Sequence, residues 1–112
     1  MTATLSLRID LPYGRIGPGK IALLEAIGRE GSISAAGRAI GMSYKRAWDL
    51  VDETNRLLGT PVVSASPGGR RGGGAALTEA GRALVEDYRA IERAAQGAAA
   101  PRLAALLRRT EG

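Results

Sequence analysis

The 112-residue chain contains no cysteine, no histidine and no phenylalanine, and it has a single tryptophan. Without cysteine the chain has neither disulfides nor a thiolate nucleophile. Without cysteine and histidine it lacks the usual zinc ligands, and without histidine it lacks the base of a histidine-based catalytic triad. An enzyme site would have to use carboxylates or lysine, and the acidic residues fall on predicted helix surfaces without a convergent arrangement. We therefore expect no catalytic residues, no metal and no cofactor.

Long apolar runs are missing as well. Arg8 and Asp10 interrupt the N-terminal segment, which argues against a signal peptide, and no stretch approaches the roughly 20 apolar residues of a membrane span. We expect a cytoplasmic protein without membrane contact. The formal net charge is +5, from 16 lysine and arginine residues against 11 aspartate and glutamate residues, and this excess favours a polyanionic partner.

The stretch from Gly31 to Gly59 (GSISAAGRAIGMSYKRAWDLVDETNRLLG) predicts two helices joined by a tight turn. Ser32 and Ser43 stand at the N-cap positions, where a serine hydroxyl accepts a hydrogen bond from a free backbone N–H. Gly41 lies at the reversal, because glycine reaches a left-handed φ without a Cβ penalty. The small pair Ala36–Gly37 lets the helices approach closely. This pattern is typical of a DNA-binding helix-turn-helix, whose second helix enters the major groove.

The first turn of the second helix is basic and exposed. Lys45 and Arg46 can hydrogen-bond a guanine edge or a phosphate, and the simpler interpretation is a solvated helix face. Trp48 either packs under the neighbouring hairpin or faces the DNA backbone. Asp49 and Asp52 would repel phosphates, so we expect them at the margin or paired with Arg46 or Arg56. The residues of this motif that we expect to contact DNA are Ser32, Ser34, Ser43, Tyr44, Lys45, Arg46 and Trp48.

The flanking segments predict small β elements. Period-two alternation from Thr4 to Leu11 indicates a half-buried strand, followed by a loop through residues 12–18 and a helix from near Gly19 that closes at Gly28 and Gly31. Residues 61–66 (PVVSAS) and 75–77 (AAL) indicate the two strands of a hairpin. Its tip, PGGRRGGG, carries Arg70 and Arg71, which we expect to reach a minor groove or a phosphate strand. The alternative is a loop with incidental arginines.

The last third of the chain predicts a long helix that begins after Thr78, a suitable N-cap. Gly97 and Pro101 predict a break, followed by a short helix from Arg102. The order of strand, three helices, hairpin and helix predicts a mostly α fold with small β: a winged helix-turn-helix over residues 1–77, then a dimerisation arm and a short C-terminal helix over 78–112. The arm carries an apolar stripe, which we expect to form part of a dimer interface. The alternative is a place in the chain's own core. The stripe consists of Leu84, Val85, Tyr88 and Ile91.

Two motifs resemble the ModE family of molybdate-responsive repressors: the recognition-helix segment MSYKRAWDLVDETN and the wing with its following step, PGGRRGGGAALTEAG. The likeness spans roughly Leu5 to Ala95, and AAGRAIGMS and LTEAGRALV are more loosely similar to LysR-type regulators. The resemblance implies a homodimeric winged-helix regulator with the helix of Ser43–Arg46 in the major groove of a palindromic operator and the helix from Thr78 in the dimer contact. Full-length ModE members carry C-terminal molybdate-binding modules, whereas this chain ends soon after the arm, so we do not expect it to sense molybdate by itself.

The sequence therefore favours a dimeric, sequence-specific regulator of transcription that binds double-stranded DNA. Its recognition helix would lie in the major groove and its wing on adjacent phosphates or the minor groove. The alternative function is a winged-helix adaptor that binds proteins and has little affinity for random DNA at low salt.

Overall fold

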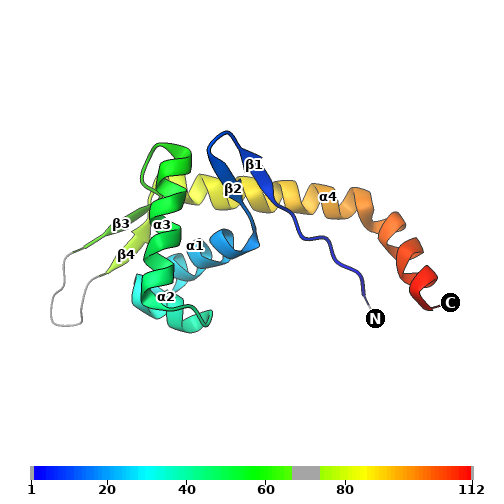
Figure 1. Cartoon of the computed structure of the whole chain (residues 1–112), viewed down its shortest axis with the longest axis horizontal. Helices are drawn as coiled ribbons and strands as arrows, with labels where there is room; N and C mark the ends of the chain where they lie inside the picture. Colours follow the sequence, from blue (N-terminus) through cyan, green and yellow to red (C-terminus); the bar gives the residue numbers. More distant parts are fainter. Residues whose placement is uncertain (1, 67–73, 112) are drawn as a thin grey trace.

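The computed structural model describes residues 2–66 and 74–111 (Figure 1). An N-terminal hairpin, three helices, a second hairpin and a long helix follow one another along the chain, which confirms a mostly α fold with small β elements. The bounds are β1 (Ile9–Leu11), β2 (Gly14–Ile16), α1 (Pro18–Glu30), α2 (Ile33–Ala39), α3 (Tyr44–Leu58), β3 (Val63–Ala65), β4 (Ala75–Leu77) and α4 (Glu79–Glu111).

The N-terminal strand differs from its prediction. Only Ile9–Leu11 pairs as a strand, and its antiparallel partner is Gly14–Ile16, which was predicted to lie in a loop. Gly14 makes this hairpin possible, because its φ is +156° and the Leu57 side chain occupies the space that a Cβ would need. β2 could not be predicted from its own residues, because three residues that include a glycine show too little apolar alternation. Its pairing with β1 is what makes it a strand.

Residues 2–8 remain extended and lie along α4, where their side chains alternate between half-buried and exposed (Figure 1). The Leu5 N–H donates to Oε1 of Gln96 at 3.1 Å, and the Tyr88 hydroxyl donates to the Leu7 carbonyl at 2.8 Å. The predicted alternation is thus real, but the segment packs against a helix rather than within a sheet.

The main core lies where α1, α2, α3 and the second hairpin meet. Pro18 occupies the start of α1, where its fixed φ suits a helix, and Gly31 ends α1 with a φ of +76°. Gly28, predicted near the end of this helix, lies inside it. The buried apolar side chains of the main cluster are Leu23, Leu24, Ala26, Ile27, Ile33, Ala36, Ala47, Leu50, Val51, Val62 and Val63.

A second, smaller cluster joins the N-terminal hairpin to α1 and α4 through Ile16, Ile21 and Tyr88. Leu84 and Val85 pack against both clusters, so the first half of α4 closes one side of the domain. The second half projects beyond the body, and together with the N-terminal segment it gives a molecule of 58 × 29 × 19 Å.

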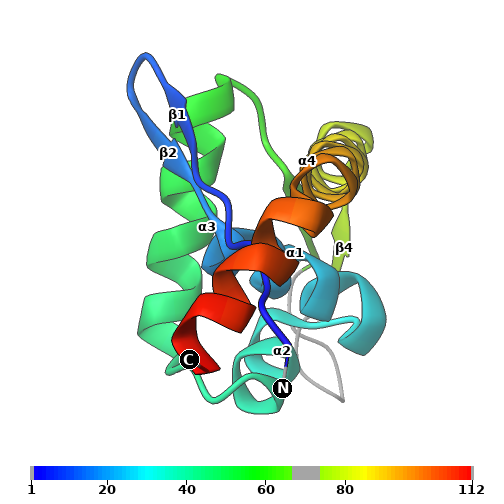
Figure 2. The ribbon, with the colours of Figure 1, turned by 90° about the vertical axis from the view of Figure 1, so that its right-hand side faces the viewer.

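The long helix α4 runs from Glu79 to Glu111 with Pro101 inside it, so the predicted separate helix from Arg102 is wrong. Figures 1 and 2 show instead that the orange-to-red end of α4 turns away from the axis of the yellow part. A proline within a helix lacks an N–H and crowds the carbonyl four residues earlier, here that of Gly97, and this produces a kink. None of the described helices is both long enough and apolar enough to cross a membrane.

Candidate nucleic-acid interface

Both helices of the motif begin at their predicted N-caps. The Ser32 hydroxyl oxygen accepts a hydrogen bond from the Ala35 N–H at 3.0 Å, and the Ser43 hydroxyl oxygen accepts one from the Arg46 N–H at 3.1 Å. Gly41 has a φ of +72° at the reversal between the helices. These local contacts fix the helix starts, so Ser32 and Ser43 serve the structure of the motif whatever further contact they make.

Close packing sets how α2 lies against α3. Ala36 and Ala47 are fully buried, and a Cβ added at Gly37 would lie 2.9 Å from the Met42 carbonyl oxygen and 3.8 Å from the Ala47 Cβ. The predicted role of the Ala36–Gly37 pair is therefore confirmed, because no larger side chain fits between this face of α2 and the following turn.

The first turn of α3 projects outward. Tyr44 is 58% exposed, the Lys45 side chain is 87% exposed, and Arg46 is exposed. Lys45 donates to Asp49 at 3.1 Å, so the partner of Asp49 is Lys45 and not Arg46 or Arg56, the partners offered as one of its two predicted positions. The reason is helical spacing, since residues i and i+4 share one face of α3. The turn therefore presents a phenol, an ammonium group and a guanidinium group to solvent.

Trp48 lies between the main core and the second hairpin, and its contact with the DNA backbone stays a prediction. It is half-buried, packs against the main core cluster, and meets the Tyr44 ring edge-on with centroids 6.3 Å apart. Together with Tyr44 it lines a hollow of about 250 Å³ between α3 and the strands β3 and β4. Ser34 lines the same hollow and its hydroxyl accepts a hydrogen bond from Arg38 at 2.7 Å.

The second hairpin is fixed to the helical body at its base. The Ala75 N–H donates to the Gly31 carbonyl at 2.8 Å, and the Val62 N–H donates to Oδ1 of Asn55 at 2.8 Å. β3 and β4 pair as the predicted hairpin, with Val63 opposite Leu77, although β3 covers only Val63–Ala65 of the predicted strand over residues 61–66. Arg70 and Arg71 lie outside the described residues.

The predicted stripe on α4 divides between core and surface. Tyr88 is fully buried in the second cluster, so it serves its own chain's core and its ring is not available to a partner. Leu84 and Val85 are half-buried against the same body, whereas Ile91 is 49% exposed. Leu106, further along α4, is 56% exposed.

Two ion-pair networks were not predicted. Lys20, buried in α1, donates to Glu53 of α3 at 3.0 Å and to the Arg15 carbonyl at 2.6 Å. Arg89 of α4 makes two hydrogen bonds to Glu25 of α1, at 3.1 and 2.6 Å, and one to Glu92 at 2.8 Å. These partners are 33 and 64 residues apart, and no local pattern links them.

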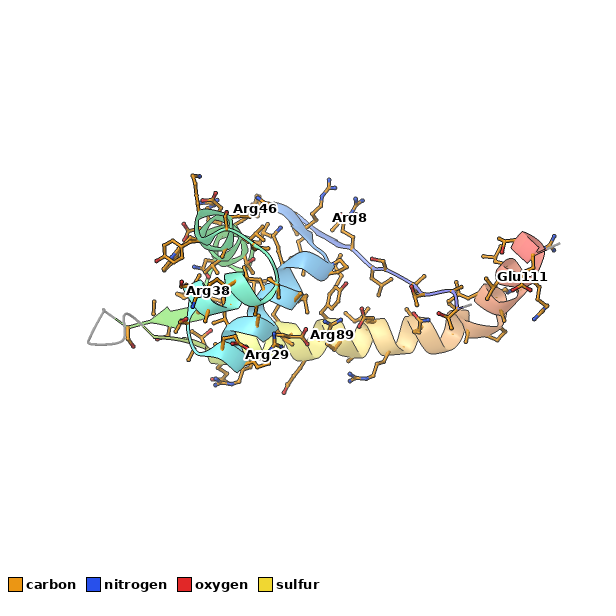
Figure 3. All side chains as sticks on the ribbon, turned by 90° about the horizontal axis from the view of Figure 1, so that it is seen from below. Arg8, Arg29, Arg38, Arg46, Arg89 and Glu111 are labelled. Atoms are coloured by element: carbon orange, nitrogen blue, oxygen red, sulfur yellow. The ribbon has the colours of Figure 1, made fainter. Side chains whose placement is uncertain are left out.

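The Arg89 network shifts the titration of its members. Hydrogen bonds from Arg89 lower the pKa of the Glu25 carboxyl, against the opposing effect of partial burial, and the hydrogen bonds that Arg89 donates to Glu25 and then to Glu92 raise the pKa of Arg89. Burial raises the pKa of the neighbouring Tyr88. The network holds α4 against α1, on the side of the body opposite α3 (Figure 3).

Known proteins share this motif and its sequence. The chain is 60% identical over 78 residues to the molybdenum-pterin-binding protein MopB of Rhodobacter capsulatus, an alignment that covers 70% of this chain and 29% of MopB. It is 44% identical over 71 residues to the DNA-binding transcriptional dual regulator ModE of Escherichia coli, covering 63% of this chain and 27% of ModE. The chain thus spans just over a quarter of the length of these relatives, and the comparison confirms the resemblance to ModE-type regulators.

The fold is also found in a solved structure. The CbnR_DBD–DNA complex matches with a TM-score of 0.60 and 26% identity, over 78% of this chain and 95% of the matched one. This match confirms the winged-helix architecture with a long C-terminal helix. The model of bacterial regulatory helix-turn-helix proteins of the lysR family matches residues 19–82, which is more than half of the sequence. The chain therefore belongs to the lysR family of bacterial regulatory helix-turn-helix proteins.

Proposed function

We propose that this chain is a dimeric, sequence-specific DNA-binding regulator of transcription, and that its role is binding without catalysis. The observation that carries the proposal is the exposed first turn of α3, in which Tyr44, Lys45 and Arg46 project from a helix that is capped at Ser43 and packed tightly against α2. A rigid helix with an exposed polar N-terminal turn fits the major groove, which admits one α-helix.

The side chains of that turn suit different parts of a duplex. Arg46 can make a bidentate contact with the O6 and N7 atoms of guanine, and Lys45 can contact the same edge or a phosphate. The Lys45–Asp49 pair is exposed, and such pairs contribute only about 0.2–1 kcal/mol, so DNA can displace Asp49. Tyr44 and Ser34 border the hollow beside the second hairpin, where they would meet the sugar-phosphate strand.

The second hairpin is proposed to act as the wing. Its anchoring to Gly31 directs the strands away from the body, and Figure 1 places them beside α3. Arg70 and Arg71, at the tip of this hairpin in the sequence, are proposed to contact phosphates or the minor groove next to the major-groove site.

Dimerisation is proposed to use α4. Its second half projects from the body, and two large apolar side chains are exposed on the helix: Ile91 in its first half and Leu106 in its second. A two-fold dimer through this helix would place two copies of α3 on one duplex, so the operator is expected to be palindromic. A regulator acting on bacterial DNA would be located in the cytoplasm.

The proposal is tested by selecting bound sequences from a random duplex pool, followed by gel shifts with the selected duplex at fixed salt. We expect a palindrome and a steep salt dependence, because each phosphate contact contributes about −0.9 to the log–log slope. The Lys45→Ala and Arg46→Ala variants should each lose affinity by about 1–3 kcal/mol, roughly 5- to 150-fold. Arg56→Ala, an exposed change in the last turn of the same helix, is the control. Unchanged affinity of both first-turn variants would show that this turn does not read DNA.

One observation favours the adaptor alternative. Asp49 and Asp52 are exposed on α3 and place negative charge on the face that DNA would meet. A protein-binding module would have weak affinity for random duplex at low salt, whereas the proposed regulator should bind it measurably through its phosphate contacts. The same gel shift therefore separates the two functions.

A further inference from the structure

A second basic surface lies beside α3, on the side away from the wing. Arg8 and Arg15 come from the N-terminal hairpin region, Lys20 from the first turn of α1, and Arg46 from the first turn of α3. All four line one open hollow of about 370 Å³, together with Glu53. We call these four cations, with the acids Asp10 and Glu53 that pair with them, the hairpin cluster.

The hairpin cluster keeps a positive balance after its internal ion pairs are counted. Glu53 pairs with buried Lys20, and Asp10 pairs with Arg8 at 3.1 Å, so four cations face two carboxylates. The Arg8–Asp10 pair is 54% and 66% exposed, and exposed pairs are weak enough for a stronger anion to compete with them. The N-terminal end of α1, at Gly17, has no side-chain cap and adds a smaller positive potential.

The position of this cluster relates it to the proposed DNA surface. Figure 1 shows α3 between the wing strands and the N-terminal hairpin. Figure 3 shows Arg8 and Arg46 projecting on the α3 side of the molecule, opposite α4. A helix in the major groove has a phosphate strand on each side of it, and Arg46 belongs both to the reading turn and to the hairpin cluster.

We propose that the hairpin cluster is a second phosphate-contacting site, in which Arg8 and Arg15 bind the DNA backbone on the side of α3 opposite the wing. The lysR family model matches residues 19–82, and Arg8 and Arg15 lie before that segment. The proposed contact therefore adds residues outside the matched segment to the DNA-binding surface. Guanidinium groups bind phosphate oxygens in a charge-assisted and often bidentate manner, without reading the base. The inference rests on the proposed DNA-binding function.

The test measures binding to the selected duplex by fluorescence anisotropy between about 50 and 200 mM salt. If each of the two arginines makes one phosphate contact in each protomer, Arg8→Gln and Arg15→Gln should each reduce the magnitude of the log–log slope by about 1.8 per dimer. Base preference should stay the same, because phosphate contacts carry no sequence information. Arg29→Gln is the matched control: Arg29 is also an exposed arginine paired with a neighbouring acid, Glu30, and Figure 3 places it away from Arg8 and Arg46.

A change of opposite sign sharpens the test. Asp10→Asn removes the carboxylate that competes with DNA for Arg8, so affinity should rise. Glu30→Gln should leave affinity unchanged, because Glu30 pairs with Arg29 away from the hairpin cluster and salt screens exposed charges over distance. Equal urea midpoints would show that all variants fold alike.

The outcomes separate this inference from the function on which it rests. If the unaltered chain does not bind the duplex, both proposals fail. If it binds and Arg46→Ala weakens binding, but Arg8→Gln and Arg15→Gln match Arg29→Gln in slope and affinity, the hairpin site is wrong and the regulator function stands. A change in base preference by Arg15→Gln would also overturn the inference, because it would mean that the hairpin reads bases.

Discussion

Replacing Gly37 by alanine probes the contact that sets the angle of the recognition helix. Gly37 lies inside α2, so the backbone itself accepts alanine, but the new Cβ would stand 2.9 Å from the Met42 carbonyl oxygen. Real Cβ atoms almost never approach an atom so closely. Because the obstacle is backbone rather than a flexible side chain, α2 must move away from the turn that leads into α3.

The magnitude follows from two opposing effects. Alanine is favoured over glycine within a helix by about 1 kcal/mol, and overpacking of a tight contact costs about 1–3 kcal/mol. Gly97→Ala isolates the first effect, because Gly97 lies in α4 and, apart from the adjacent backbone of its own helix, no described atom comes within 4 Å of its added Cβ. We therefore expect Gly37→Ala to be less stable than Gly97→Ala by about 1–3 kcal/mol.

The assay is urea unfolding at one protein concentration, followed by far-UV circular dichroism and by the emission of Trp48, the single tryptophan. Trp48 lies on α3, so its emission reports the motif itself. At about 4 °C per kcal/mol for a chain of this length, thermal midpoints of the two variants should also differ measurably. If Gly37→Ala gained as much stability as Gly97→Ala, the close approach of α2 to the turn would not constrain the motif, and the reasoning would be refuted.

Two further predictions concern α4. Since Arg89 lowers the pKa of Glu25 in the folded state, this carboxylate contributes stability above its ordinary pKa of 4.5 that is lost as the pH falls through the lower folded pKa. The stability advantage of the unaltered chain over Glu25→Gln should therefore shrink as the pH falls below 4.5, and an advantage independent of pH would contradict the ion pair. Tyr88→Phe removes the hydroxyl that donates to the Leu7 carbonyl and should cost about 0.5–1.5 kcal/mol in urea unfolding, whereas Tyr13→Phe, at a site 88% exposed, should cost nothing measurable. Equal effects of the two changes would show that the hydrogen bond from Tyr88 to Leu7 does not stabilise the fold.

Sequence reasoning located the helix-turn-helix well because its signals are local. A capping serine, a glycine at positive φ and a pair of small residues act within a few positions, so Ser32, Gly41, Ser43 and Gly59 marked the bounds of α2 and α3. The exposed basic turn followed from those bounds. The strands β3 and β4 were found for the same reason, since β-branched residues and a glycine-rich connection lie together in the chain.

The same reasoning failed where the answer depends on distant partners. Gly14–Ile16 is a strand because Ile9–Leu11 pairs with it, and α4 continues through Pro101, where a local rule predicted a break. Tyr88 belongs to an apolar helical stripe that would suit either a partner chain or the core. Only the packing of Ile16 and Ile21 around its ring assigns it to the core.

By itself, the sequence determined the class of molecule: a basic chain without thiols or imidazoles, with a capped helix-turn-helix whose second helix begins with Tyr44, Lys45 and Arg46. These properties depend on residue chemistry and on backbone preferences that act over one turn. Tertiary structure alone decided that Arg8, Arg15 and Arg46 border one hollow, and that Glu25 holds Arg89 across 64 residues. Such contacts arise when separate elements bury their apolar faces together, and no spacing along the chain encodes them.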